Sequence, residues 1–275
     1  YIYWGTATGY SAADRTDLQT DGALLADIAD YDADGYTDIA FAQYYGDTGG
    51  FQVGSLVYYG TGRGFSTGAS TSLPTSGAHD VESADLDGDG WLDLVFCNHQ
   101  DGTSGEIDST VYWGSASGFS ASNRTDLEGH GCLEIAIEDL DADGYDDLVM
   151  ANYYDATSGY AAESYVYYGS SSGFSETDRD ALPTTGTRGI ATGDFDGDGW
   201  TDVAFGQYTN GSSYYDYGYV YYGASTGYSA TNRDAVWSPG VRDLAAADLD
   251  GDGYDDLVLP SYYGGSHWTA SYVYY

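Results

Sequence analysis

An acidic run of nine residues that recurs five times is the feature of this sequence that most limits its fold. The second copy reads DLDGDGWLD, and the copies occupy residues 30–38, 85–93, 139–147, 194–202 and 248–256. Their starts lie 55, 54, 55 and 54 residues apart. A fixed period of this size indicates a repeat architecture. Five such units fill the chain of 275 residues, so we predict a single repeat domain over residues 1–275.

Each unit predicts four short strands, A to D. Strand A is apolar and small (23–29), the acidic run follows it, and strand B comes next (38–44). Strand C alternates Tyr and Val, as at 219–223, and strand D is a segment such as 124–127. Alternation with period two and the abundance of β-branched and aromatic residues favour strands, and no stretch has a helical period.

Four strands per unit predict an all-β fold, a β-propeller with five blades of four antiparallel strands. Strand A is expected innermost, where crowding at the axis favours small side chains. The alternative is an open β-solenoid, which is less favoured because its coils are usually shorter and it needs distinct capping repeats.

The acidic runs carry carboxylates at places one, three, five and nine and a glycine at place six. The first half of an EF-hand loop has this pattern, but that loop needs a Glu at place twelve. Here the twelfth places hold apolar residues of strand B, namely Phe41, Phe96, Met150, Phe205 and Leu259. We therefore reject an EF-hand. Three alternating Asp side chains, the carbonyl at place seven and the Asp at place nine form an oxygen shell suited to Ca²⁺, which Mg²⁺ fits less well.

A solvated Asp/Gly turn is the alternative for any single copy. Five copies with all 20 Asp positions filled argue against it, because like charges packed this closely repel one another unless they are neutralised. We expect about five Ca²⁺, one per blade. They would change the formal charge from −37 to −27, at +2 for each ion.

The repeats resemble the FG-GAP/VCBS type, found in the calcium-loop blades of integrin α-subunit propellers and in bacterial surface proteins. The motif D-x-D-x-D-G-x-x-D, followed by a strand D-[LIV]-[AV]-[FLM], covers all five units. The resemblance implies a calcium-stabilised propeller in extracellular adhesion or scaffolding. Two departures argue against transferring the ligand-binding role of integrins: their propellers have seven blades with calcium in only some, and the GAP segment is replaced here by FAQ, FCN, MAN, FGQ and LPS.

Carried over place by place, the resemblance assigns five metal ligands to each loop, with the seventh place contributing its carbonyl. These are Asp30, Asp32, Asp34, Tyr36 and Asp38; Asp85, Asp87, Asp89, Trp91 and Asp93; Asp139, Asp141, Asp143, Tyr145 and Asp147; Asp194, Asp196, Asp198, Trp200 and Asp202; and Asp248, Asp250, Asp252, Tyr254 and Asp256.

The charge balance limits the partners. There are 44 acidic residues against 7 arginines and no lysine, which disfavours nucleic acid and anionic membrane surfaces. No apolar run approaches the roughly 18 residues of a membrane span. Because the chain starts at Tyr1 without Met, we expect a mature or excised piece of a longer precursor, secreted or at the cell surface.

No enzyme is expected. There is no G-x-S-x-G elbow, and metal binding accounts for the spacing of the carboxylates. The histidines fall at unrelated places in the repeat, so they imply no zinc cluster and no catalytic dyad; they are His79, His99, His130 and His267. Arg188 and Arg242 lie at equivalent starts of strand A, and we predict that they line one mouth of the channel, facing Asp80, Glu134 or Asp243.

The expected function is a non-catalytic adhesive or structural module whose partner is a protein or glycan of a cell surface. The alternative is a lectin that stacks sugars on the aromatic residues of the divergent B–C loops (43–55, 98–110, 152–164, 207–219 and 261–272). Cys97 and Cys132 are equally compatible with one disulfide and with two free thiols, and Asn123 and Asn210 begin glycosylation sequons that matter only in a eukaryotic secretory context.

The chain begins and ends with a copy of strand C, at 1–5 and 272–275. A closed ring of five blades, with the N-terminal strand D joined to the last A–B pair, then has six C strands for five places. One copy is displaced, or it pairs with a neighbouring subunit by strand exchange and supports self-association, or the chain is cut from a longer array.

Overall fold

All regular structure in the described part of the chain is β. The computed structural model describes residues 1–275 except 48, 67, 69 and 263–269. Within these residues there are 21 strands, and no helix is long and apolar enough to cross a membrane. The prediction of an all-β chain is confirmed.

Four consecutive antiparallel sheets of four strands form the body of the molecule, each in simple chain order. The first holds β3 (Ala23–Ala29), β4 (Asp38–Gln43), β5 (Ser55–Tyr58) and β6 (Thr71–Leu73), and the second holds β7 (Ala78–Ala84), β8 (Asp93–Asn98), β9 (Ser109–Tyr112) and β10 (Arg124–Leu127). The third holds β11 (Cys132–Glu138), β12 (Asp147–Asn152), β13 (Glu163–Tyr167) and β14 (Arg179–Pro183), and the fourth holds β15 (Thr187–Gly193), β16 (Asp202–Gln207), β17 (Tyr217–Tyr221) and β18 (Arg233–Trp237).

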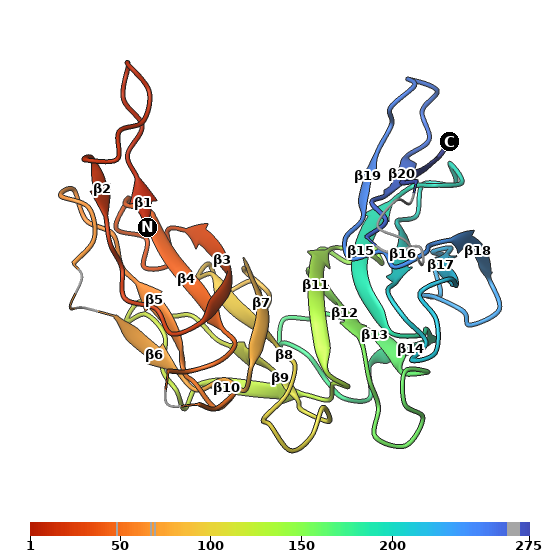
Figure 1. Cartoon of the computed structure of the whole chain (residues 1–275), viewed down its shortest axis with the longest axis horizontal. Helices are drawn as coiled ribbons and strands as arrows, with labels where there is room; N and C mark the ends of the chain where they lie inside the picture. Colours follow the sequence, from red (N-terminus) through yellow and green to blue (C-terminus); the bar gives the residue numbers. More distant parts are fainter. Residues whose placement is uncertain (48, 67, 69, 263–269) are drawn as a thin grey trace.

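The two ends of the chain form smaller sheets. At the N-terminus β1 (Ile2–Tyr3) pairs with β2 (Arg15–Thr16), and at the C-terminus β19 (Ala245–Ala247), β20 (Asp256–Leu259) and β21 (Tyr272–Tyr274) form a sheet of three strands. The sheets follow one another along an open arc, with the two termini on opposite arms (Figure 1).

The expected pairing of the N-terminal strand D with the last A–B pair is not formed. Among the described residues β2 pairs with β1, and β21 pairs with β20. The physical reason is the surplus of C strands: β21 occupies the place beside β20 that β1 would take in a closed ring. Within the described part of the chain, no strand of one arm pairs with a strand of the other.

Strand A lines the inside of the arc, as predicted. Each strand A contacts the next one, in the order β3, β7, β11, β15 and β19. In the first four of these strands the pairing with strand B has a bulge after the first residue. A bulge re-aims the side chain of its extra residue. The residues at this place are Leu24, His79, Leu133 and Arg188.

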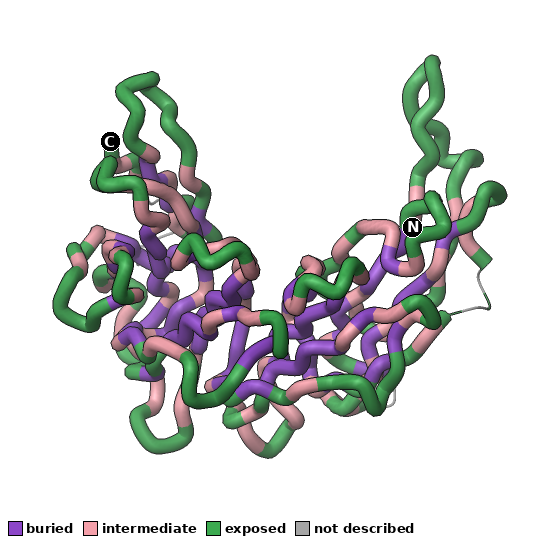
Figure 2. Tube along the Cα trace, turned by 180° about the vertical axis from the view of Figure 1, so that it is seen from behind, coloured by how far each residue is buried: buried purple, intermediate pink, exposed green. Residues whose placement is uncertain are grey.

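The apolar core lies between neighbouring sheets. Strand B is the most buried element, and all six residues of β8, β12 and β16 are buried. One cluster joins Val95 and Val111 of the second sheet to Ile135, Leu148 and Met150 of the third. Buried residues run along the middle of the arc and the two arms are exposed (Figure 2). Each inner sheet is thus stabilised by both of its neighbours.

A buried tyrosine near the end of strand C ties each sheet to the one before it. Tyr112 of β9 donates its hydroxyl hydrogen to the carbonyl of Pro74, which follows β6, at 2.5 Å. The equivalent bonds run from Tyr167 to Glu128 (3.0 Å) and from Tyr221 to Pro183 (2.5 Å). The alternating Tyr-Val-Tyr pattern therefore marks a structural link and not only a strand.

Cys97 of β8 and Cys132 of β11 form a disulfide, with a Cα–Cα distance of 5.3 Å. Of the two states that the sequence left open, the structure contains the bridged one. The bond joins strand B of the second sheet to strand A of the third, so it cross-links two units that are otherwise held by packing.

Candidate metal loops and the inner face

The acidic run of each repeat forms the loop between strands A and B, and its carboxylates converge. The Asp side chains at places one, three and nine bring carboxylate oxygens to within 4.8 Å of one another. This holds for Asp30, Asp32 and Asp38; Asp85, Asp87 and Asp93; Asp139, Asp141 and Asp147; and Asp194, Asp196 and Asp202. The last loop, with Asp248, Asp250 and Asp256, has the same internal hydrogen bonds.

Backbone hydrogen bonds fix the shape of every loop. In the first, the amide of Gly35 donates to Asp30 and the amide of Tyr36 donates to Asp34, at 2.9 and 2.8 Å. The fourth and sixth places are left-handed, and Ala33 at place four has φ 57°. A left-handed conformation is costly for a residue with a Cβ. The loop tolerates it because the surrounding hydrogen bonds impose the turn.

The Asp at place nine is the first residue of strand B and is almost completely buried. Asp147, with no exposed surface, accepts hydrogen bonds from the amides of Leu140 and Gly169, at 2.9 and 2.8 Å. It thereby joins the loop, strand B and the end of strand C. Burial raises the pKa of Asp147 and of Asp93 to about 7, against the opposing effect of the two backbone amides that donate to each carboxylate. A cation beside the carboxylate would favour its charged form.

The donor set fits a hard cation. Asp85 Oδ1 is buried and has no hydrogen-bond partner among the described residues, so it is an acceptor that still needs a donor or an ion. The fifth-place carboxylates stand outside these converging groups, and one oxygen of each, as in Asp89, accepts the amide of place seven. The structure thus brings together three of the four predicted carboxylates in each of those loops.

Comparison with protein families identifies the repeat. The FG-GAP-like repeat family matches four overlapping segments, residues 30–96, 85–150, 139–205 and 194–259, which together span most of the chain. Each segment begins at the acidic loop of one repeat and ends within strand B of the following repeat. The chain belongs to the FG-GAP-like repeat family.

Comparison with solved structures finds chains that are similar to this FG-GAP chain at low identity. The Vibrio cholerae biofilm matrix protein Bap1 aligns over 94% of this chain with 18% identity and a TM-score of 0.48, and rhamnogalacturonan lyase YesW aligns over 86% with 17% identity and a TM-score of 0.51. The alignments cover 37% of the Bap1 chain and 46% of the lyase chain, so this chain spans less than half of either. Comparison with curated protein sequences gives no significant match.

The inner face of this FG-GAP chain carries a second cluster of charged residues. Arg188 and Arg242 line one cavity together with Asp80, Glu134 and Asp243, as the sequence predicted. The guanidinium of Arg242 donates to the hydroxyl of Tyr208 at 3.0 Å and lies over the ring of Tyr262 at 3.8 Å.

Burial and mutual repulsion govern the acids of this face. Burial first, and then the charges of Asp243 and Asp80, raise the pKa of Glu134 to about 9. Burial, followed by the charge of Arg188, lowers the pKa of His79 to about 4. Glu134 is therefore neutral at pH 7, and His79 is an uncharged partner for Arg188, 3.4 Å away.

The aromatic residues of the B–C loops fold back on their own loops. Tyr45 meets Phe51 edge to face, with ring centroids 4.9 Å apart, and Tyr154 meets Tyr160 at 5.2 Å. Tyr45 and Tyr154 keep exposed fractions of 46% and 39%. Part of each ring remains open to a ligand. Residues 263–269 of the last predicted sugar-stacking loop lie outside the described residues, as does His267.

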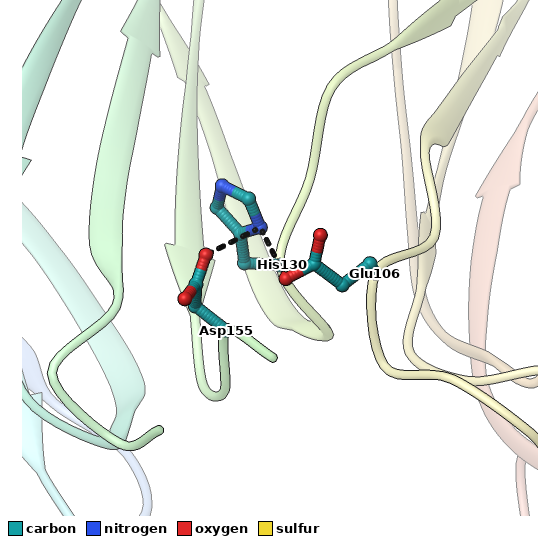
Figure 3. Close-up of side chains that lie close together, drawn as sticks. All are labelled: Glu106, His130 and Asp155. Atoms are coloured by element: carbon teal, nitrogen blue, oxygen red, sulfur yellow. Dashed lines mark ion pairs between the residues drawn. The ribbon is translucent and has the colours of Figure 1, made fainter. Parts of the chain in front are cut away.

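The repeat positions of the histidines implied no metal-binding group, but the structure places His130 among residues that could hold a metal ion. Its ring lies between the carboxylates of Glu106 and Asp155, and ligand atoms of the three lie within 4.8 Å of one another (Figure 3). Repeat position could not reveal this group, because its members come from three different loops. The available signal was topological: B–C and D–A loops emerge at the same end of a four-stranded antiparallel sheet.

Proposed function

We propose that this chain is a calcium-stabilised, non-catalytic FG-GAP module that acts outside the cell in adhesion or as a structural scaffold. The convergence of three carboxylates in the A–B loops, one of them buried at the start of strand B, is the observation that carries the proposal. Carboxylate oxygens in a glycine-containing loop are the ligands that Ca²⁺ prefers in proteins.

The residues that would hold calcium are the Asp side chains at places one, three, five and nine of each loop and the carbonyl at place seven. A bound cation supplies charge neutralisation and cross-links the loop. Because the ninth-place Asp also accepts the amides of place two and of the strand C end, calcium bound there stabilises three segments at once. Binding to the folded state alone contributes about 2.7 kcal/mol per site at 100 times Kd.

An extracellular location is supported by the disulfide and by the charge. Disulfides persist in oxidising compartments and are rare in the cytosol. Millimolar calcium outside cells suits sites of moderate affinity, such as those of extracellular modules. A net charge of −37 is better tolerated where calcium is abundant.

Thermal unfolding with excess calcium and with EDTA tests the proposal. We expect a midpoint at least 10 °C higher in calcium, because several sites contribute together. Equal concentrations of Mg²⁺ serve as the control and should restore less of the difference, since Mg²⁺ demands octahedral geometry and keeps its waters. An unchanged midpoint on chelation would refute the calcium function.

The second candidate is a lectin, supported by the partly exposed side chains of Tyr45 and Tyr154, which lie at the start of their B–C loops. Saturable binding to a glycan array at micromolar concentration, lost in the variant Tyr45→Ala or Tyr154→Ala, would favour this function over scaffolding. Absence of glycan binding with retained adhesion to a protein-coated surface would favour the scaffold.

Exposed apolar residues on β3, the first strand A in the chain, support a proposal about assembly. Leu24 of β3 is 49% exposed, whereas Leu133 at the same place in β11 is 4% exposed. We propose that the exposed face of β3 is covered in the assembled protein, either by closure of the five sheets into one ring or by strand exchange with a second copy. Electron microscopy of the purified protein decides between rings, filaments and open monomers, and the last outcome contradicts this proposal.

A further inference from the structure

Three loops at one end of the second and third sheets bring Glu106, His130 and Asp155 together (Figure 3). Glu106 lies between β8 and β9, His130 between β10 and β11, and Asp155 between β12 and β13. His130 Nδ1 is 3.8 Å from Glu106 Oε1 and 3.5 Å from Asp155 Oδ2. The calcium loops connect the other ends of these strands, so the group is separate from them.

The orientation of the imidazole leaves Nδ1 without a hydrogen-bond partner among the described residues. Nε2 lies 2.7 Å from the hydroxyl of Tyr165, which can accept its hydrogen, and 3.6 Å from Glu128 Oε1. Nδ1 is buried and forms no hydrogen bond with any described residue, and the whole side chain is only 12% exposed. With its proton on Nε2, the ring directs a lone pair toward two carboxylates. Three electron donors that face one point form a site that could hold a cation.

The two carboxylates are held in place by backbone groups. Asp155 Oδ1 accepts the amides of Thr157 and Ser158, which leaves Oδ2 directed at His130. Glu106 Oε1 accepts the amide of Ala156, so the loop of the second sheet is tied to that of the third. The ligand atoms are thus arranged before any ion binds, and ordering them costs little.

The donor set and its spacing suit zinc. An imidazole nitrogen with two carboxylate oxygens is a common set for Zn²⁺, whereas Ca²⁺ takes oxygen ligands only. Tetrahedral ligands at 2.0–2.2 Å from zinc are roughly 3.3–3.6 Å apart. The two separations from Nδ1, 3.5 and 3.8 Å, need only a small contraction, and the ligand oxygens of Glu106 and Asp155 lie within 4.8 Å of each other. The hydrogen bond from Nε2 to Tyr165 is the kind of outer contact that fixes the tautomer of a metal-bound histidine.

We propose that Glu106, His130 and Asp155 bind one Zn²⁺ at the junction of the second and third sheets. Three protein ligands leave a fourth position for water or for a donor group of a partner. Thr157, Ser158 and Glu163 line the same cavity as His130 and Asp155. The ion would bridge the two sheets that the disulfide Cys97–Cys132 also joins.

Zinc titration in excess calcium tests the site, because calcium then occupies the acidic loops. Isothermal titration calorimetry of the full chain should give one zinc ion per chain in the wild type. The variant His130→Gln should bind it at least about 100-fold more weakly. Asp14→Asn, which removes an exposed carboxylate between β1 and β2 and outside the group, should change the affinity less than threefold. Melting curves in calcium confirm that each variant is folded.

A spectroscopic measurement separates zinc binding from a simple ion pair. Co²⁺ in place of zinc should give the visible absorption of a four-coordinate ion in wild type and in Asp14→Asn, but not in His130→Gln. Zinc should also shift the ring resonances of His130 in NMR spectra. Equal zinc affinity in wild type and His130→Gln, or His130 resonances that do not respond to zinc, would overturn the proposal.

Discussion

The acidic residues at the two ends of the sheets differ in whether they recur from repeat to repeat. At one end, the A–B loops repeat the same carboxylates at the same places in each repeat, and the ninth-place Asp is bound to the same backbone groups in the first four. At the other end, the carboxylates near His130 occur once and come from loops that differ between repeats. The repeated A–B loop carboxylates stabilise a turn that every sheet needs in order to fold. The group around His130 occurs once and distinguishes the junction of the second and third sheets from the other junctions.

The largest expected effect comes from removing the buried ninth-place Asp of one A–B loop. Asp147→Ala leaves the amides of Leu140 and Gly169 without an acceptor, and we expect a loss of about 3–5 kcal/mol in the free energy of unfolding, even in EDTA. The control Asp143→Ala, in the exposed fifth place of the same loop, should cost about 1 kcal/mol or less in EDTA and more in calcium. Urea unfolding measures both. Equal losses in EDTA would contradict a structural role specific to place nine.

Removal of the disulfide tests the junction that carries the His130 group. The double variant Cys97→Ala/Cys132→Ala releases a cross-link over a sequence separation of 35 residues and should lose about 3–4 kcal/mol. Reducing agent should destabilise the wild type by a similar amount and leave the double variant unchanged. If the reducing agent affects both proteins equally, it acts on something other than this bond.

The inner face should give a smaller effect that depends on pH. In the folded state the pKa of Glu134 is raised to about 9, so the protonated side chain contributes to the free energy of unfolding. This contribution is fully present below the unfolded pKa near 4.5 and is lost as pH rises through 9. Glu134→Gln removes this loss, and we expect a gain on the order of 1–2 kcal/mol at pH 7 and above.

The measurement is the urea midpoint at pH 5, 7 and 9 in excess calcium, with the exposed Glu163→Gln as control. Asp80, Glu82, Asp243, Arg188 and Arg242 share the cavity, so some pH dependence should remain in the variant. A stability that falls as steeply with pH in Glu134→Gln as in wild type would contradict the assignment.

The smallest expected effect sharpens the comparison among the A–B loops themselves. Ala142 has φ 61°, where the second loop has Gly88 at φ 73°. Ala142→Gly should relieve the left-handed strain and gain about 0.5 kcal/mol after the added entropy of the unfolded chain. The reverse change, Gly88→Ala, should destabilise, because its Cβ would lie 3.1 Å from the ring of Tyr145. Thermal midpoints in calcium measure both changes, and a loss on Ala142→Gly would show that the strain is absent.

The sequence predicted whatever recurs with the period of the repeat. The local sequence pattern recurs in every repeat. It predicted the strand order, the inner position of strand A and the start of strand B at the ninth-place Asp. The open arc could not be predicted this way, because it depends on competition between two copies of strand C for one edge. Nor could the His130 group, whose members lie in loops of unequal sequence and meet only after neighbouring sheets pack.

The tyrosine bonds between sheets all point the same way along the chain. Each strand C hydroxyl reaches an acceptor that precedes it in sequence, as Tyr167 reaches Glu128 and Tyr221 reaches Pro183. Because synthesis proceeds from the N-terminus, the sheet that holds the acceptor is synthesised before the strand C whose tyrosine binds it. Folding can advance one repeat at a time behind the ribosome, and the newest sheet is always the one that secures itself to finished structure.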